Sequence, residues 1–285
     1  MRAPEAMTKT VVNALTIDVE DYFHVSAFER YVARSAWDAH PHRVEANIDR
    51  ILEILDGAGV HATFFTLGWV AERYPEMVRR LVAEGHELAS HGYAHERATA
   101  LEPDAFTADV VLAKAVLEDV AGAEVQGYRA PSFSIGEKNR WAYDCLADAG
   151  YRYSSSIYPI LHDHYGSPEA PRFTHDVCAG LVEVPITTAR WLRKNWPAGG
   201  GGYFRLMPYA VSRWLIQRVN TIDGESAIFY FHPWEIDPEQ PRMDGVDIRT
   251  RFRHYVNLHR TAGRLAQLMR DFRWDRMDCV VLGEQ

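Results

Sequence analysis

The sequence predicts an α/β fold built on parallel strands, either a barrel or a doubly wound sheet. Short apolar runs bounded by turn residues alternate with helical patterns, and this alternation favours parallel strands joined by crossover helices. A chain of 285 residues, 47% of them hydrophobic, is long enough to bury one large core, and α/β barrels of this size commonly form one domain. The sequence contains no repeat, low-complexity tract or dividing linker. We therefore expect a single domain over residues 1–285.

The first half of the chain predicts four strands and three helices. Each predicted strand is a short apolar run that ends in turn or polar residues, and each helix shows the apolar spacing of an amphipathic segment. The expected order is strand 11–18, helix 43–57, strand 61–68, helix 75–84, strand 86–91, helix 103–121 and strand 125–131.

The second half is less regular but continues the same alternation. Residues 196–209 include four consecutive glycines flanked by aromatic side chains, which is typical of a flexible connector or of a mobile aromatic flap over a site. The other expected elements are helix 138–149, strand 151–157, a polar loop with three prolines, strand 180–187, helix 207–219, strand 226–232 and helix 250–272.

Composition argues against several classes of function. The net charge of −8 and the pI near 5.9 argue against a basic surface for nucleic acid or for an anionic membrane and leave only a local basic cleft open. We therefore expect no nucleic-acid partner. The three cysteines are widely spaced and form no CxxC pair, so we expect neither a disulfide framework nor a thiolate zinc site. No run of 18 apolar residues and no signal-peptide pattern is present. These features predict a cytoplasmic protein without a transmembrane segment.

The first predicted strand ends in three carboxylates, Asp18, Glu20 and Asp21. Ligands bind at the carboxyl ends of parallel strands, so carboxylates at this position favour a site over a solvated strand end. Side chains alternate along a strand, which places Asp18 and Glu20 on one face and turns Asp21 away. The two-apart pair can therefore meet one ligand.

His91 and His95 lie four residues apart after another predicted strand. Imidazole nitrogens and one carboxylate, with a position open for water, make a catalytic metal site, although a HxxxH pair alone is a weak signal. Arg129 and His232 also follow predicted strands. In a barrel all these strand ends open on one face, so the set predicts a shared active site.

Four segments occur along the chain in this order: "LTIDVED", "SHGYAH", "RAPSF" and "FYFHPWE". Together, and in this order, they resemble the polysaccharide deacetylases of the NodB-homology type, carbohydrate esterase family 4. The segments "DVEDYFHVSAFE", "IYPILHDHYGSPEAPR" and "GGGGYFRLMPY" are similar to the branch associated with exopolysaccharide and exosortase gene clusters. The resemblance implies a distorted (β/α) barrel with a branch-specific C-terminal extension from about residue 190. It also implies metal-dependent removal of N-acetyl groups from amino sugars in exopolysaccharide biosynthesis.

The resemblance assigns roles residue by residue. Asp18 falls on the catalytic base, and Arg129 on the residue that orients this base. His91 and His95 fall on the metal histidines, and His232 on the general acid. The implied cofactor is one divalent ion, zinc first, with cobalt and nickel as alternatives.

The sequence departs from the family pattern in two places. Val19 stands where most members have a metal-binding aspartate, so strand alternation assigns that ligand to Glu20, with Asp21 in reserve. The segment "RAPSF" replaces RxPYG, so the oxyanion contact is expected from the backbone N–H of Ser132. No partner that orients the general acid is evident. The candidate substrate-binding residues are His162, Tyr165, Trp196, Tyr203 and Trp234.

Two alternatives stay open at the level of sequence. Related barrels resembling allantoinase act on small cyclic amides without a metal, and a member with a damaged site would bind saccharides without hydrolysing them. The intact His91 and His95 pair and an acid at His232 argue against the first alternative. The second leaves Asp18, Arg129 and His232 without a role. The expected partner is an N-acetylated saccharide, as a lipid-linked or nucleotide-linked intermediate before export.

Overall fold

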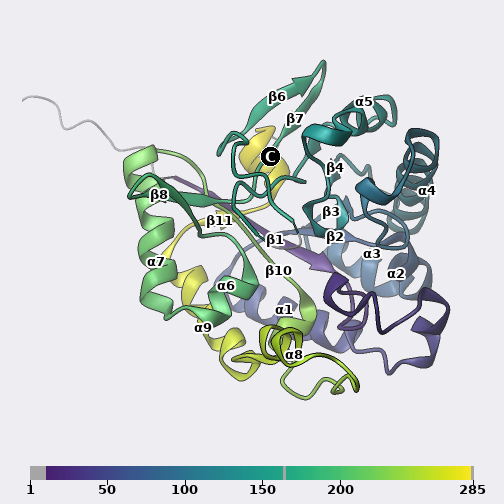
Figure 1. Ribbon diagram of the computed structural model, residues 1–285, viewed down its shortest axis with the longest axis horizontal. Helices are drawn as coiled ribbons and strands as arrows, with labels where there is room; N and C mark the ends of the chain where they lie inside the picture. Colours follow the sequence, from purple (N-terminus) through teal and green to yellow (C-terminus); the bar gives the residue numbers. More distant parts are fainter. Residues whose placement is uncertain (1–10, 163–164, 284–285) are drawn as a thin grey trace, which may run out of the picture.

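A curled parallel sheet forms the centre of the computed structural model, which describes residues 11–162 and 165–283 (Figure 1). The strand order is β10-β1-β2-β3-β4-β5-β7-β6, with β11 also paired to β1, and β6 is the one antiparallel strand of this order. The strands are β1 (Asn13–Val19), β2 (Thr63–Thr66), β3 (Glu87–Ser90), β4 (Gly127–Tyr128), β5 (Tyr153–Ser154), β6 (His175–Cys178), β7 (Leu181–Glu183), β10 (Ile228–Phe231) and β11 (Trp274–Asp275).

Strand β1 lies between β2 and β10 and shows how the sheet separates two layers. Its register pairs Ala14 with Ile228 on one side and Asp18 with Phe65 on the other. Alternate side chains face the barrel interior, where Ala14 packs with Phe65 and Ile228. The intervening residues, including Val19, pack in the core beneath the helices. Val19 therefore points away from the interior that holds Asp18.

The barrel is closed by single backbone hydrogen bonds where strand pairing ends. Beyond β7, the N–H of Ile186 donates to the carbonyl of Ile157 (2.9 Å), and the N–H of Thr187 donates to Ile228 (3.3 Å). The N–H of Tyr230 donates to the carbonyl of Gly199 at 2.7 Å. The predicted α/β class with a distorted barrel is confirmed.

Helices cover the outside of the sheet (Figure 1). The expected helix over 250–272 is wrong, because Asn257 takes a left-handed conformation (φ 55°) and its side-chain amide donates to the carbonyl of Arg205. The helices are α1 (Val44–Ala58), α2 (Gly68–Arg73), α3 (Pro75–Ala83), α4 (Pro103–Ala121), α5 (Trp141–Asp148), α6 (Gly201–Leu206), α7 (Tyr209–Arg218), α8 (Ile248–Tyr255), α9 (Leu258–Asp271) and α10 (Met277–Val281).

Close packing requires two of the four consecutive glycines, Gly199 and Gly201. A Cβ atom at Gly199 would overlap the carbonyl oxygen of Ile228, and one at Gly201 would overlap the carboxylate of Glu235. The segment runs parallel to β10, with a bridge between Gly200 and Tyr230, and then forms α6, whose residues Gly202, Tyr203, Arg205 and Leu206 line the site. Packing thus explains Gly199 and Gly201, whereas a side chain at Gly202 would meet no atom within 4 Å.

Three strands that form antiparallel pairs, β6, β8 (Thr188–Trp191) and β9 (Lys194–Pro197), were absent from the predicted elements, whereas β7 lies within the predicted strand 180–187. Strand β6 pairs with β7, and β8 pairs with β9 in a separate hairpin. Short pairs of this kind depend on their partner strand more than on local apolar periodicity. Among the described helices, none combines the length and apolar character that crossing a bilayer requires.

Candidate active site

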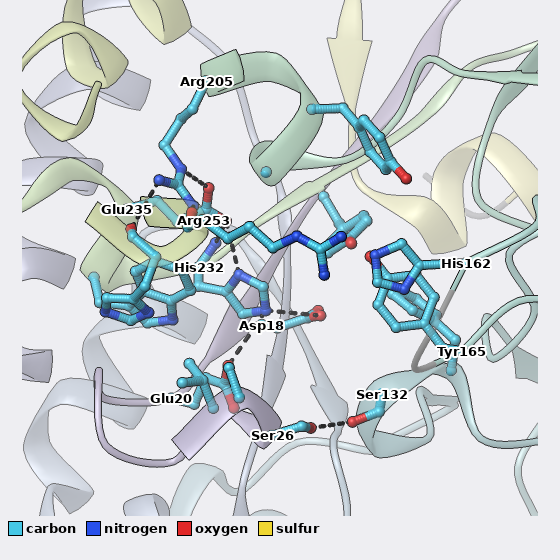
Figure 2. A pocket seen from close by; sticks show the side chains of 18 of the residues that line it. Asp18, Glu20, Ser26, Ser132, His162, Tyr165, Arg205, His232, Glu235 and Arg253 are labelled. Atoms are coloured by element: carbon cyan, nitrogen blue, oxygen red, sulfur yellow. Dashed lines mark hydrogen bonds and ion pairs between the residues drawn. The ribbon is translucent and has the colours of Figure 1, made fainter. Parts of the chain in front are cut away.

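One pocket of about 320 Å³ opens where β1, β3, β4 and β10 end. Its volume lies at the lower end of the roughly 300–1,000 Å³ that small-ligand sites occupy. Figure 2 shows polar side chains on one wall, with His162 and Tyr165 facing them across the cavity. The lining includes Asp18, Glu20, His91, His95, Ser132 and His232. The buried Arg129 contacts the base from within the barrel, and Asp21 is not among the lining residues.

Glu20, His91 and His95 converge in this pocket. One ligand atom from each lies within 4.8 Å of the other two, and the Nε2 atom of His95 is 3.0 Å from a carboxylate oxygen of Glu20. The Nδ1 atom of His91 lies 2.8 Å from the carbonyl oxygen of Arg129. A donor N–H at this nitrogen leaves Nε2 as a lone-pair donor, the arrangement found in metal-bound histidines.

The electrostatics of the three side chains suit a cation. Burial lowers the pKa of His91 to about 4, so its imidazole is neutral at physiological pH. Burial alone would raise the pKa of Glu20, but the neighbouring His95 and His232 lower it well below its ordinary value. A carboxylate and a neutral imidazole are the protonation states that ligate zinc and similar divalent ions. The donor set therefore fits such an ion.

Asp18 is held from inside the barrel by Arg129. The guanidinium donates to a carboxylate oxygen of Asp18 at 2.6 Å and to the hydroxyl of Thr16 at 2.8 Å. Its Nε and Nη2 atoms donate to the carbonyl and the hydroxyl of Ser155. The Cζ atom of the guanidinium lies 4.0 Å from the ring centre of Phe65. Arg129 is fully buried, so these contacts fix the orientation of the Asp18 carboxylate.

Asp21 has a different task from its neighbours. Its carboxylate accepts hydrogen bonds from the backbone N–H groups of Tyr22, Arg43 and Val44, at 2.9, 2.6 and 3.0 Å. Arg43 and Val44 begin helix α1, so Asp21 caps this helix and lies outside the Glu20 cluster. Of the two carboxylates considered for the metal, the structure brings only Glu20 to the histidines.

The partner of His232 is Glu235, which the sequence analysis missed. A carboxylate oxygen of Glu235 lies 2.7 Å from Nδ1 of His232, and its other oxygen accepts from Nε of Arg205 at 2.6 Å. Nε2 of His232 then faces the pocket, 3.3 Å from Glu20 and 3.9 Å from Asp18. Figure 2 shows this chain of contacts from Arg205 to the two carboxylates.

A sequence signal for Glu235 existed in the segment "HPWE". The spacing of three residues is that of a capping pair, and the backbone N–H of His232 also donates to Glu235 at 3.2 Å. The ring of Trp234 stacks on His232 with a centroid distance of 5.2 Å and on His254 at 4.2 Å. The short turn Pro233–Ile236 therefore positions both the imidazole and its carboxylate partner.

His232 is the strongest base among the pocket histidines with shifted pKa values. Burial by itself lowers the pKa of His232, but the carboxylates of Glu20, Glu235 and Asp18 outweigh it and raise the pKa to about 9. The pKa of Glu235 lies below its ordinary value because Arg205 and His232 offset the burial of its carboxylate. His232 is therefore protonated at neutral pH, and its positive charge is paired with the carboxylate of Glu235.

The remaining candidates divide between the pocket and the hairpin. Ser132 lines the pocket with a left-handed backbone (φ 58°), and its hydroxyl contacts that of Ser26. Trp196 lies instead on β9, away from the residues that line the pocket, with its ring 5.8 Å from that of Trp191. The pairing of β9 with β8 fixes Trp196 in the hairpin, opposite Ala189. The other aromatic candidates, His162, Tyr165, Tyr203 and Trp234, line the pocket.

Comparison with known proteins places this geometry in a family. The polysaccharide deacetylase profile matches residues 29–154, and a domain of unknown function (DUF3473) matches residues 155–282. A peptidoglycan-N-acetylglucosamine deacetylase of Bacillus cereus is 33% identical over 94 residues, 33% of this chain and 34% of the relative. A chitooligosaccharide deacetylase of a Bradyrhizobium species is 31% identical over 150 residues, 52% of this chain and 65% of the relative. Residues 29–154 therefore carry a polysaccharide deacetylase domain.

Solved structures agree with this deacetylase fold. A crystal structure from Mycobacterium smegmatis, assigned as a polysaccharide deacetylase, superposes with a TM-score of 0.62 at 21% identity, covering 99% of this chain and 92% of that one. A pseudoenzyme of the CE4 family from Bacillus anthracis superposes with a TM-score of 0.50 at 16% identity, covering 96% and 66%. The fold thus occurs in a protein described as a pseudoenzyme, so the fold alone does not establish activity.

The chain spans less than two thirds of the length of the two curated relatives. Its pocket draws residues from outside and from both of the matched segments. Asp18 and Glu20 precede residue 29, the two metal-site histidines lie within 29–154, and His232 lies within 155–282. The predicted domain range with an extension from about residue 190 stays a prediction.

Proposed function

We propose that this protein is a metal-dependent hydrolase that removes N-acetyl groups from amino-sugar residues of a saccharide. One observation carries the proposal. The cluster of Glu20, His91 and His95 shares one pocket with two oriented proton-transfer groups, Asp18 and His232. The names of the relatives, deacetylases of peptidoglycan and of chitooligosaccharide, support the same class of reaction.

Glu20, His91 and His95 would hold a divalent ion, with zinc as the first candidate and cobalt or nickel as alternatives. When bound, such an ion polarises the acetyl carbonyl and lowers the pKa of water. The chain contributes a buried site in which the donor nitrogen of His91 is already oriented by the carbonyl of Arg129. This orientation limits reorganisation on binding.

Asp18 would act as the general base. Arg129 occupies one oxygen of its carboxylate, so the other oxygen is available towards the pocket and can accept the proton of the attacking water. Positioned proton transfer of this kind contributes roughly 100- to 10,000-fold to a rate. The backbone N–H of Ser132 is the proposed donor to the oxyanion that forms as the carbonyl carbon is attacked.

His232 would act as the general acid. Its Nδ1–H is directed to Glu235, so the proton on Nε2 is the one that faces the pocket and can pass to the sugar nitrogen as the C–N bond breaks. The products are acetate and a free amine on the sugar. Because this amine is cationic at neutral pH, each reaction adds one positive charge to the saccharide.

The aromatic wall supports a saccharide as the substrate class. His162 stacks on Tyr165 with a centroid distance of 4.0 Å and an angle of 17° between the rings, and Tyr203 lies on the same side of the pocket. Ring faces of this kind pack against the apolar face of a sugar ring. We further propose a role in exopolysaccharide biosynthesis, on lipid-linked or nucleotide-linked intermediates in the cytoplasm, on the strength of the family-branch segments.

The test is acetate release from a panel of N-acetylated oligosaccharides by protein stripped of metal and then loaded with zinc, cobalt or nickel. We expect activity to return with the metal and to be lost in His91→Ala together with metal binding. His232→Ala should keep the metal. It should slow amide hydrolysis far more than hydrolysis of activated acetate esters, whose leaving group needs no proton.

Other outcomes would select the alternatives. Full activity without metal on a cyclic amide would indicate the allantoinase-like reaction, and saccharide binding without acetate release in metal-loaded protein would indicate an inactive binding protein. Equal loss of amide and ester hydrolysis in His232→Ala would remove the acid role from His232.

A further inference from the structure

An exposed aromatic patch lies outside the pocket, on the β8–β9 hairpin and helix α7. The ring of Trp191 is 5.8 Å from that of Trp196 and 5.5 Å from that of Trp214. These side chains are 41%, 39% and 43% exposed, and Leu192 at the hairpin tip is 71% exposed. We call Trp191, Leu192, Trp196 and Trp214 the tryptophan patch. Contiguous exposed apolar groups of this kind mark interaction surfaces.

The hairpin turn holds its apolar tip in a costly conformation. Leu192 and Arg193, the two residues between β8 and β9, both have left-handed backbones, with φ of 50° and 63°. A two-residue turn of this geometry favours Asn-Gly, and left-handed conformations are unfavourable for large side chains. The turn therefore keeps a leucine and an arginine exposed at the expense of its own stability.

The surroundings of the patch are cationic although the whole chain is acidic. The hairpin (188–197) and α7 together contain five arginine or lysine residues and neither Asp nor Glu, in a chain of net charge −8. Arg190, Arg193 and Lys194 are exposed on the hairpin, and within the described residues neither Arg193 nor Lys194 forms an ion pair. This is the local basic surface that the overall charge left open.

The hairpin is also connected to the pocket wall. The side-chain amide of Asn195 on β9 donates to the carbonyl of Pro159 at 3.0 Å, in the loop that continues to His162. After β9 the chain passes through Gly199 into α6, whose residue Tyr203 lines the pocket. A surface bound at the hairpin would therefore contact a segment that is directly connected to two walls of the pocket.

We propose that the tryptophan patch and its cations dock the protein on the surface of an anionic phospholipid bilayer. Tryptophan rings favour the headgroup region, an exposed leucine enters the acyl boundary, and lysine and arginine pair with lipid phosphates. A saccharide fits the patch less well, because the Trp191 and Trp214 rings meet at 85° and offer no common flat face. This docking is independent of the proposed deacetylation.

Vesicle sedimentation of the full chain tests the docking. We expect binding to vesicles of phosphatidylcholine with about one third phosphatidylglycerol, little binding to phosphatidylcholine alone, and release at high salt. R193E with K194E should weaken binding about tenfold or more. Leu192→Asn with Arg193→Gly should also weaken binding while raising the Tm, because Asn-Gly relieves the turn.

The matched control is K138E with R140E, which reverses two exposed cations at the start of α5, across the molecule from β8 in Figure 1. It should leave vesicle binding unchanged. Equal sedimentation of the hairpin variants and the wild type would overturn the proposal. The proposal would also be overturned if Trp191→Ala still bound vesicles normally but no longer bound N-acetylated oligosaccharides. The same holds if its only defect were lost dimerisation in analytical ultracentrifugation. Acetate release from soluble oligosaccharides should be unaffected in every hairpin variant.

Discussion

Two carboxylates at the carboxyl end of β1 lie two residues apart, and the structure gives them different neighbours. Asp18 is held by Arg129, whereas Glu20 meets His91 and His95. We expect Asp18→Asn to retain the metal while lowering kcat by roughly 100- to 10,000-fold, because it removes proton transfer but no ligand. Glu20→Gln should lose the metal. Metal analysis of dialysed protein, together with acetate release, measures both effects.

Asp21→Ala serves as the control for this comparison, because its carboxylate is bound to backbone N–H groups instead of the metal site. It should keep the metal. A metal-free Asp18→Asn variant, or a Glu20→Gln variant with full occupancy, would show that the roles of base and ligand are exchanged.

His232 depends on Glu235 for its protonated state. Glu20, Glu235 and Asp18 together raise the pKa of His232 to about 9 against the effect of burial. A cation at Glu20 offsets part of that carboxylate's effect, so Glu235 carries more of the shift in the loaded enzyme. A general acid works only below its pKa. Glu235→Gln should therefore move the basic limb of the kcat/KM profile to lower pH, by about one unit.

Glu239→Gln is the matched control, because Glu239 is an exposed carboxylate in the same segment. Its pH profile should follow the wild type. An unchanged basic limb in Glu235→Gln, with metal content and Tm retained, would mean that the limb reports a group other than His232.

Side-chain alternation explains why the β1 carboxylates could be assigned from the sequence. It predicts that Asp18 and Glu20 share a face and that Val19 lies opposite, and the structure places Val19 in the core under the helices. Glu235 was missed because a turn, with no strand or helix periodicity, brings it to His232. Arg205 could not be assigned at all, because it comes from a helix whose position depends on glycine packing.

At the scale of elements, Asp21 couples the end of β1 to the start of α1. Its carboxylate is the acceptor for three backbone N–H groups, two of them at the helix N-terminus. Asp21→Ala leaves these donors without their acceptor, so we expect it to lower the free energy of unfolding by about 2 kcal/mol. Urea unfolding at constant metal concentration measures this change.

Asp21→Ser keeps one hydroxyl acceptor and should recover part of the lost stability. If Asp21→Ala matched the wild type in urea, the cap would contribute nothing to the stability of α1. Retained metal in both variants separates this structural role from ligation.

Element prediction succeeded where a segment carries its own pattern. Helix α4 occupies Pro103–Ala121, as expected for 103–121, and β10 occupies Ile228–Phe231 within the expected 226–232. The break between α8 and α9 was missed because Asn257 is fixed by a contact with Arg205, distant in sequence. The β8–β9 hairpin was missed because its turn contains no glycine or asparagine signal.

At the scale of the whole molecule, β1 joins the two segments matched by separate family profiles. Its hydrogen-bonded neighbours are β2 from the first segment and β10 and β11 from the second. The hydroxyl of Thr16 also donates to the carbonyl of Phe229 at 2.9 Å. The pocket is also built from both segments, because His232 comes from the second segment and the metal-site histidines come from the first.

A fragment of residues 1–154 should therefore fail to fold, although it contains the whole deacetylase match. Without β10, strand β1 becomes an exposed edge. The buried side chains of Phe229 and Leu265 are also missing from the core that β1 shares with α1. We expect no cooperative transition in calorimetry of the fragment, one transition in the full chain, and weak zinc binding by the fragment. Co-expression with residues 155–285 should restore both properties. A fragment that unfolds cooperatively and binds zinc as tightly as the full chain would show that the second segment is a separate domain.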